Sequence, residues 1–264
     1  AVVPCAVWAV VRTAGLEGAS PLVPFLTAIP YVAALSPVAL LLAVLSRGRL
    51  VGAVALLTVV ALGAAVLPRA LAAPAAPASG APLKVLSANL LFGHADAESV
   101  VELVRRLEPD VFATQELTPW AVERLDAAGL AELMPYRVLE ARFGASGSGI
   151  YSRHPLTEVE DLFPVVGHSM PVARLTLPSG PTVEIVDVHT VAPLGPRQTA
   201  EWAAGLRALP AAPDSGAYRV LVGDFNASLD HAELRKVVAR GYVDAADATG
   251  HGLVPTWPAG RRLP

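Results

Sequence analysis

The chain has 264 residues, of which 53 % are hydrophobic and only 16 % are charged, with 24 Pro, 21 Gly and a single Cys. So high an apolar content excludes a disordered chain, and so low a charged fraction argues against one ordinary soluble domain. Residues 1–70 hold four of the 20 basic and one of the 23 acidic residues, so the remainder carries a net charge of −6. This division predicts a membrane segment joined to one soluble domain. The lone Cys5 excludes an internal disulfide.

Two stretches predict membrane-spanning helices, because roughly 20 apolar residues cross the hydrocarbon core of a bilayer. They are residues 21–46, which carry no charge, and residues 50–68, which lie between flanking arginines. Residues 1–11 are also apolar and indicate the end of another span, with a cleaved signal peptide as the competing interpretation. We therefore expect about three transmembrane helices within residues 1–69, the first one partial.

The basic residues between these helices predict their orientation. Arg47 and Arg49 lie between the second and third spans, and the positive-inside rule places them in the cytoplasm. The Ala/Pro-rich linker 70–82 and the domain 83–264 then lie outside a multi-pass chain of the cell membrane. Arg69, on the outer side, counts against this orientation.

Beyond the linker, short apolar runs alternate with helical stretches. Asp96 and the pair Thr118-Pro119 are expected to begin helices, and Pro178-Ser179-Gly180 signals a hairpin. Strands that mix hairpins with helical crossovers fit a layered α/β sandwich. The expected strands are 83–90, 111–115, 136–142, 149–152, 170–177, 181–189 and 218–224, and the expected helices include 96–108, 197–209 and 229–240.

Polar residues stand at the ends of four predicted strands. Three strands finish at Asn89, Glu116 and His189. A fourth finishes at Asp224, with Asn226 two residues later. Such a set of carboxylates, amides and imidazole suits a hard cation and a phosphate, since Mg²⁺ prefers oxygen ligands. Asp224 would orient or deprotonate a water molecule, and Asn226 and His189 would donate hydrogen bonds to phosphate oxygens.

The stretches that carry these residues resemble the endonuclease/exonuclease/phosphatase superfamily, which has the DNase I-like fold. The matching segments are LSANLLFG (86–93), PDVFATQE (109–116), YSRHPL (151–156), VDVHT (186–190) and VLVGDFNASLDH (220–231). The resemblance implies a four-layer α/β/β/α sandwich, preceded here by N-terminal transmembrane helices. It also implies that Asn89 and Glu116 bind the metal, Mg²⁺ or alternatively Mn²⁺, and that His189, Asp224 and Asn226 are catalytic. With its spans the chain is similar to membrane-anchored actinobacterial members, which include a teicoplanin-resistance type.

One part of the superfamily pattern does not occur in this sequence. The pattern closes on a strand with an Asp-His pair, and Thr256-Trp257 resembles the stretch that precedes it, but the sequence stops at Pro264. Asp230-His231 follows GDFNAS too closely to replace that pair. The chain is therefore expected to be a fragment, cut at both ends, lacking its C-terminal strand and inactive without it, so that the function belongs to the parent protein.

The leading functional hypothesis is a metal-dependent phosphoesterase at the outer membrane face. Water would attack the phosphorus of a phosphodiester, a phosphomonoester or a lipid (pyro)phosphate in line. An endonuclease or exonuclease acting on extracellular nucleic acid is the first alternative, although a net charge of −6 disfavours long nucleic acids. A non-catalytic membrane-anchored binding or sensor module is the second. The expected partners are the lipid bilayer and a lipid, cell-envelope or nucleic-acid phosphoester, with no obligate protein partner.

Several remaining polar residues are assigned structural positions. Asp187 alternates with valines and is expected at a polar strand position. Four histidines show no ligand spacing and are assigned to the surface or to loops: His94, His168, His231 and His251.

Overall fold

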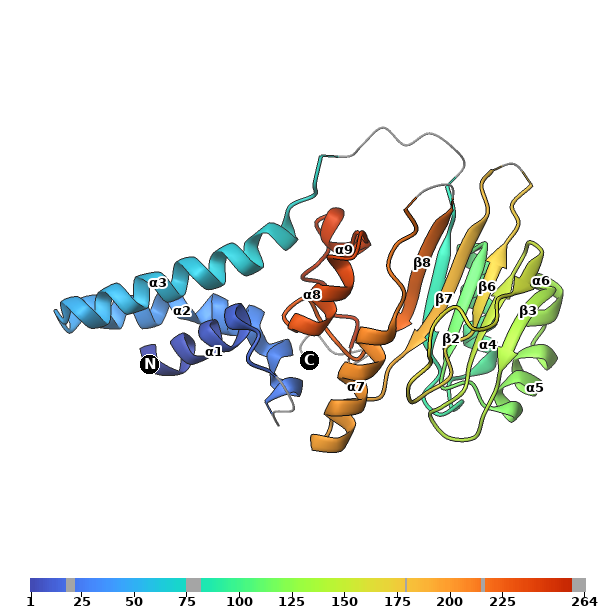
Figure 1. Ribbon diagram of the computed structural model, residues 1–264, viewed down its shortest axis with the longest axis horizontal. Coiled ribbons are helices and arrows are strands. Elements are labelled where there is room, and N and C mark those ends of the chain that lie inside the picture. Colours follow the sequence, from blue (N-terminus) through green and yellow to red (C-terminus); the bar gives the residue numbers. More distant parts are fainter. Residues whose placement is uncertain (18–21, 75–81, 179, 215–216, 258–264) are drawn as a thin grey trace. The chain divides into compact units, whose positions relative to one another are not determined.

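The computed structural model describes residues 1–17, 22–74, 82–178, 180–214 and 217–257 (Figure 1). The contacts of the chain fall into two compact units. One unit is formed by Ser79–Ala192 and Glu201–Asn226. The other is formed by Ala1–Ala78, Pro193–Ala200 and Ala227–Pro264.

The unit that contains residues 79–192 is built on two four-stranded sheets. The first has the order β1-β2-β4-β3, with β1 and β2 parallel and the other pairs antiparallel. The second has the order β5-β6-β7-β8, with only β7 and β8 parallel. The strands are β1 (Val85–Asn89), β2 (Val111–Gln115), β3 (Tyr136–Glu140), β4 (Ser148–Ser152), β5 (Leu156–Glu158), β6 (Val172–Leu175), β7 (Val183–His189) and β8 (Tyr218–Asp224).

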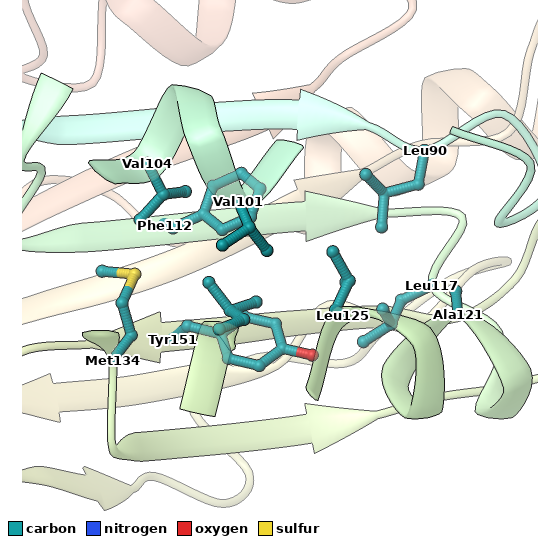
Figure 2. Close-up of a cluster of buried hydrophobic side chains, with 10 residues drawn as sticks. Leu90, Val101, Val104, Phe112, Leu117, Ala121, Leu125, Met134 and Tyr151 are labelled. Atoms are coloured by element: carbon teal, nitrogen blue, oxygen red, sulfur yellow. The ribbon is translucent and has the colours of Figure 1, made fainter. Parts of the chain in front are cut away.

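Alternation along the strands divides the core of this unit into two layers. Val111 packs between the sheets, whereas the next residue, Phe112, packs under the helices, because successive side chains of a strand point to opposite faces. The layer between the sheets contains Val111, Val138, Ile150, Ala173, Leu175, Val183 and Ile185. The layer on the outer face of the first sheet includes Leu90, Val101, Val104, Leu117, Leu125, Met134 and Tyr151 (Figure 2).

Helices α4 (Ala97–Leu107), α5 (Pro119–Ala127) and α6 (Leu130–Leu133) provide the other side of that outer layer. Both predicted helix starts are confirmed. The Asp96 side chain accepts a hydrogen bond from the Ser99 amide, and the Thr118 side chain accepts one from the Ala121 amide. These caps satisfy backbone N–H groups that the first helical turn leaves unpaired.

The other expected strands and helices of this unit also form, with bounds shifted by a few residues. Helix α7 (Pro196–Ala208) covers the expected 197–209, and β6 and β7 pair as the predicted hairpin requires. Ser179 in the predicted turn lies outside the described residues. The sandwich of two sheets with helices is therefore confirmed as the fold class.

The other unit contains the apolar N-terminal helices. Val23–Leu45 and Arg49–Ala70 span 23 and 22 residues with mean hydropathies of 2.2 and 2.6, long and apolar enough to cross a membrane. Only 22 % of each apolar window is buried within the protein, which leaves most of its apolar surface exposed. The elements of this unit are α1 (Val2–Ala14), η1 (Val23–Ala28), α2 (Ile29–Leu45), α3 (Arg49–Val66), η2 (Leu67–Ala70), α8 (Ala232–Val238) and α9 (Ala245–Ala248).

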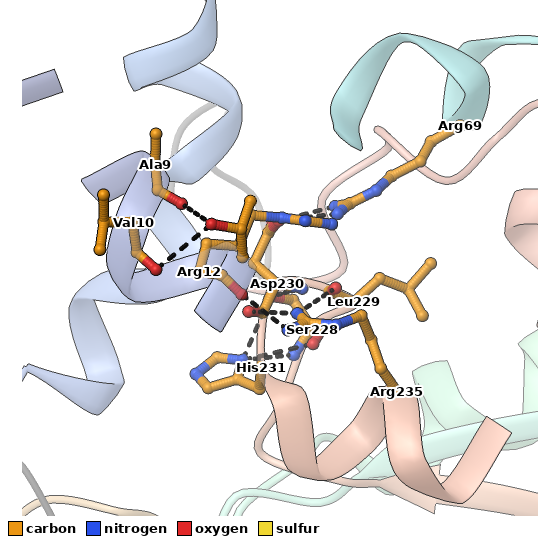
Figure 3. A network of polar contacts seen from close by, with 10 residues as sticks. Ala9, Val10, Arg12, Arg69, Ser228, Leu229, Asp230, His231 and Arg235 are labelled. Carbon is orange, nitrogen blue, oxygen red and sulfur yellow. Dashed lines mark hydrogen bonds and ion pairs between the residues drawn. The ribbon is translucent and has the colours of Figure 1, made fainter. Parts of the chain in front are cut away.

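A buried carboxylate links the two ends of the chain within this unit (Figure 3). Asp230 is 1 % exposed and accepts a hydrogen bond from Arg12 Nε at 2.8 Å. Arg69 binds the same carboxylate through two nitrogens, at 2.9 and 2.7 Å. Arg235 donates instead to the backbone carbonyls of Leu229, Asp230 and Arg12. Charge-assisted, bidentate pairing of this kind compensates the desolvation of a buried acid.

His231, assigned to the surface or to a loop, lies in the loop before α8 but is not at the surface. Its side chain is 1 % exposed, because it precedes α8 and donates from Nε2 to the carbonyl oxygen of Val23 at 2.9 Å. Its sequence neighbourhood is polar, so only the tertiary packing of α8 against the N-terminal segment accounts for the burial.

Candidate functional site

The predicted site lies where the layer between the two sheets reaches the carboxyl ends of four strands. In each of β1, β7 and β8, alternate side chains point to the same face of the sheet. The last residues of these strands, Asn89, His189 and Asp224, therefore lie on the face that points toward the other sheet. The core residues Val85, Ile185 and Val222 lie on that same face. The register pairs Asn89 with Gln115 and His189 with Asp224. Strand alternation and parallel pairing therefore bring side chains from both sheets to one rim.

The amide of Asn89 joins two carboxylates at this rim. Asn89 Nδ2 donates to Glu116 Oε1 at 2.9 Å and to Asp224 Oδ2 at 3.1 Å. Asn89 Oδ1 accepts from the amide of Leu91 at 2.9 Å, which fixes the orientation of the side-chain amide. Two acidic groups from different sheets are thus held against one nitrogen atom.

The backbone beside these carboxylates adopts unusual conformations. Glu116, Leu91 and Phe92 all have positive φ, at 56°, 51° and 54°. Such conformations are uncommon outside glycine and cluster at functional sites. The Phe92 amide donates to Glu116 Oε2 at 2.5 Å, so the turn after β1 orients the carboxylate that follows β2.

A second turn positions Asp224. The amide of Asn226 donates to Asp224 Oδ1 at 2.9 Å, and Asn226 Nδ2 donates to the Thr190 carbonyl at 2.9 Å. Gly223, with φ at 137°, has Val188 O only 2.1 Å from the position of a Cβ atom. Only glycine fits there, so the GDFN stretch is built around a close approach of β8 to β7.

The two carboxylates at the rim lack a basic counter-charge within the described part of the chain. Among the described residues neither Glu116 nor Asp224 forms an ion pair with Lys or Arg, and both side chains are partly exposed. No group of three or more His, Cys, Asp or Glu side chains that could hold a metal occurs in the described ranges. Two carboxylates and an amide are nevertheless a donor set that suits Mg²⁺, which keeps several waters and takes further oxygens from a phosphate. The residues present therefore fit a hard divalent cation.

His189 is buried at the end of β7, with 1 % exposure, and burial together with neighbouring His168 lowers its pKa to about 4. It is therefore neutral at neutral pH. His168 lies against it, with ring centroids 4.3 Å apart and Nδ1 3.4 Å from His189 Nε2. His168 lies in the loop between β5 and β6, as assigned, but that loop brings it beside a predicted catalytic residue.

A polar contact supports the site from inside the core. Asp187 is completely buried, and its carboxyl group contacts Gln115 Nε2 at 2.6 Å and the Gly149 amide at 3.1 Å. Burial raises the pKa of Asp187 well above its ordinary value. Gln115 immediately precedes Glu116, and Asp187 is two residues before His189. The two sheets are therefore bonded to each other one step behind the rim.

A profile of the Endonuclease/Exonuclease/phosphatase family matches residues 86–263. The chain belongs to this family. The family match spans all five predicted site residues, Asn89, Glu116, His189, Asp224 and Asn226, and the structure brings the strand ends that carry them to one rim. Members of the family act on phosphoester bonds, as its name states for its nucleases and phosphatases.

Solved structures to which this chain is similar include humanized TDP2 from D. rerio, at 21 % identity, with coverage of 62 % of this chain and 72 % of that chain and a TM-score of 0.45. Sphingomyelinase C from Streptomyces griseocarneus is 19 % identical, with coverages of 61 % and 70 % and a TM-score of 0.41. A beta toxin from Staphylococcus aureus with bound magnesium ions is 13 % identical, with coverages of 61 % and 70 % and a TM-score of 0.44. Among curated proteins no sequence match is found.

Proposed function

We propose that this chain is the membrane-anchored form of a Mg²⁺-dependent phosphoesterase, which hydrolyses a phosphoester by in-line attack of water. The observation that carries the proposal is the convergence of Glu116 and Asp224, from different sheets, on the amide nitrogen of Asn89. Two like charges held together, with no basic partner in the described ranges, favour binding of a divalent cation. Membership in a family of phosphoester-cleaving enzymes supports the same chemistry.

Each residue has a role in this proposal. Glu116 and Asp224 would hold the cation, Mg²⁺ or alternatively Mn²⁺, and Asn89 would join them through Oδ1 once its amide group turns its N–H donors away from the carboxylates. When bound, the cation supplies neutralisation of charge on the phosphoryl oxygens. Asp224 has one oxygen engaged by the Asn226 amide, and its other oxygen points to Asn89, where it can orient a water molecule. The second N–H of the Asn226 side-chain amide is available to donate to a phosphate oxygen, since the first binds Thr190.

The substrate we propose is a phosphoester at the outer membrane face, such as a lipid (pyro)phosphate or a cell-envelope phosphoester. Two helices long and apolar enough to cross a membrane support this location. The net charge of −6 beyond residue 70 argues against long nucleic acids, whose affinity depends on neutralising many phosphates. Extracellular nucleic acid and a non-catalytic sensor are the outcomes to be distinguished.

The test uses the full-length protein reconstituted in lipid nanodiscs. Hydrolysis of bis(p-nitrophenyl) phosphate, a lipid pyrophosphate and plasmid DNA is measured with Mg²⁺ or with EDTA. The variant Asp224→Asn removes one carboxylate charge and keeps the size of the side chain. The matched control is Asp214→Asn, which changes a residue that precedes the first residue of β8, whereas the rim lies at the last residue of that strand.

Hydrolysis that requires Mg²⁺, survives in Asp214→Asn and falls at least about 100-fold in Asp224→Asn would support the proposal, as a hydrolytic site depends on its charged groups. Preference for the lipid substrate would support the membrane location, whereas preference for DNA would favour the nuclease. Absence of both hydrolysis and Mg²⁺ binding by calorimetry would refute the enzyme and favour the sensor.

A further inference from the structure

Two loops at the rim present large apolar side chains to the outside. The turn after β1 leaves Leu91 63 % and Phe92 47 % exposed, and the loop between β3 and β4 leaves Phe143 80 % exposed. By contrast, Leu90, which directly precedes this turn, is 2 % exposed and belongs to the core under the helices (Figure 2). The chain therefore passes from the core to the surface within one residue. We call Leu91, Phe92 and Phe143 the apolar collar.

Backbone hydrogen bonds hold both loops of the apolar collar beside Glu116. In the first loop, the Phe92 amide donates to Glu116 Oε2 at 2.5 Å. In the second loop, the amide of Arg142, which directly precedes Phe143, donates to the carbonyl oxygen of Leu117 at 3.1 Å. Leu117 directly follows Glu116 in the chain. The apolar collar is therefore attached to the segment that carries one of the two carboxylates of the rim.

Neither packing nor backbone preference accounts for bulky side chains in the first of these loops. Leu91 and Phe92 have φ of 51° and 54°, a left-handed conformation that Gly, Asn or Asp adopts at lower cost. Both side chains are exposed, so burial of apolar surface within the chain does not offset this cost. Residues held in such conformations cluster at ligand-binding sites. Contact with an apolar ligand would bury the two side chains and offset the cost.

The charges near the apolar collar disfavour a polyanionic ligand. Residues 90–95 contain no Lys or Arg, and residues 141–147 contain only Arg142. Arg142 is already paired, with its Nη2 atom 3.2 Å from Glu140 Oε2. Binding of nucleic acid requires several cations to neutralise successive phosphates, whereas an apolar chain requires none. The two loops therefore suit a hydrocarbon group.

Given the function proposed above, in which the reacting phosphate lies at the carboxylates of the rim, we propose that the apolar collar is the subsite for the hydrocarbon chain of a lipid phosphate. The part of the substrate next to the phosphate passes the loops beside Glu116, and those loops offer apolar side chains. The apolar helices Val23–Leu45 and Arg49–Ala70 are long enough to hold the protein in the bilayer where such lipids occur. The phosphate contacts expected from His189 and Asn226 are unchanged by this assignment.

Two chromogenic diesters test the assignment, hexyl p-nitrophenyl phosphate and methyl p-nitrophenyl phosphate. They have the same charge and leaving group, so the ratio of their kcat/KM values reports the contribution of the alkyl chain alone. Both are hydrolysed by the full-length protein in lipid nanodiscs with Mg²⁺. We expect wild type to prefer the hexyl diester by about 10-fold or more, because burial of about two methylene groups gives a preference of this size.

The test variant combines Leu91→Asn, Phe92→Asn and Phe143→Asn. Asn adopts the left-handed conformation more readily than Leu or Phe, so the turn after β1 is not disturbed. We expect the preference for the hexyl diester to fall to about 2-fold or less, with kcat/KM for the methyl diester within about 2-fold of wild type. The matched control is Tyr218→Asn. Tyr218 is also an exposed aromatic residue, at 63 %, but it is the first residue of β8, whereas the rim lies at the last. This control should keep the preference of wild type.

A second measurement does not depend on hydrolysis. Binding of hexyl phosphate and of methyl phosphate to the same three proteins is measured by calorimetry with Mg²⁺, with empty nanodiscs as the blank. We expect hexyl phosphate to bind about 10-fold more tightly than methyl phosphate to wild type and to Tyr218→Asn, and this difference to be absent in the triple variant.

The outcomes separate the two proposals. If none of the proteins hydrolyses either diester but the difference in affinity is observed, the function proposed above fails and the apolar collar is supported as a site for an alkyl phosphate. Equal kcat/KM values for the two diesters in wild type, equal affinities for the two phosphates, or a preference that the triple variant keeps would overturn the inference.

Discussion

The burial of His189 predicts a specific loss of stability in acid. Its pKa is about 4 in the folded chain, against an ordinary value of about 6.5. Between these values the unfolded chain binds the proton and the folded chain does not, so stability falls as the pH falls. The contribution is complete above about pH 6.5 and is lost progressively toward pH 4. Because the side chain is 1 % exposed, solvent does not relieve the penalty.

Linkage gives the magnitude of this effect. A difference of that size in pKa corresponds to about 3 kcal/mol of stability lost between pH 7 and pH 4. Replacement of His189 by Gln keeps an N–H donor toward His168 and removes the titrating group. We therefore expect the free energy of unfolding of His189→Gln to fall less in acid than that of wild type, by about that amount.

The assay is chemical denaturation of the full-length protein in detergent, followed by tryptophan fluorescence at pH values from 4 to 8. The control His251→Gln changes a histidine that is exposed, and its pH dependence should match that of wild type. The carboxylates contribute equally to all three proteins, so the difference between curves isolates His189. The reasoning would be refuted if the difference in unfolding free energy between wild type and His189→Gln stayed constant with pH.

Three further predictions concern packing. Tyr151→Phe removes a hydroxyl that is buried without a described partner, so thermal denaturation should show unchanged or higher stability, by up to about 1 kcal/mol, and a clear loss would contradict this. Asp230→Ala leaves the Arg69 side chain, 6 % exposed, without its carboxylate, and should cost about 3–5 kcal/mol in the same assay, whereas a loss under about 1 kcal/mol would refute it. Gly223→Ala puts a methyl group against the Val188 carbonyl and should cost about 3 kcal/mol or more, measured as loss of folded yield and circular dichroism, and normal folding would be the contrary result.

Much of the fold was predictable because its determinants are local. These local determinants are the apolar runs of strand length, the caps Asp96 and Thr118, and the glycine before Asp224. Each of them influences only residues within a few positions of it in the sequence. The meeting of the strand ends that carry the predicted site residues was predictable for a related reason, whereas the roles of those residues stay predictions. Strand alternation and parallel register place the ends of β1, β7 and β8 at one rim without reference to loop conformation. The family match confirms the resemblance, and the teicoplanin-resistance type stays a prediction.

The neighbours of other polar residues were not predictable, because they depend on contacts between distant segments. His168 reaches the rim through the packing of a loop, and the only local signal is Gly167, which is one of 21 glycines. Asp187 was expected at a polar strand position because it alternates with valines, and it does lie in β7. Every residue of β7 is buried, however, and Asp187 follows Val183 and Ile185 on the face between the sheets. The alternation of Asp187 with valines indicated which face of β7 it lies on. It did not indicate that the other sheet packs against that face.

The bond between Gln115 and Asp187 has a consequence for how such a sequence can diverge. An apolar interface between two sheets permits small sliding movements, since dispersion contacts are weakly directional. A hydrogen bond of 2.6 Å inside that interface does not permit such sliding. It therefore fixes the position of the sheet that carries Glu116 relative to the sheet that carries Asp224. Replacement of either partner alone would leave a buried polar group without its hydrogen-bond partner. We expect the two positions to change together during evolution, or not at all.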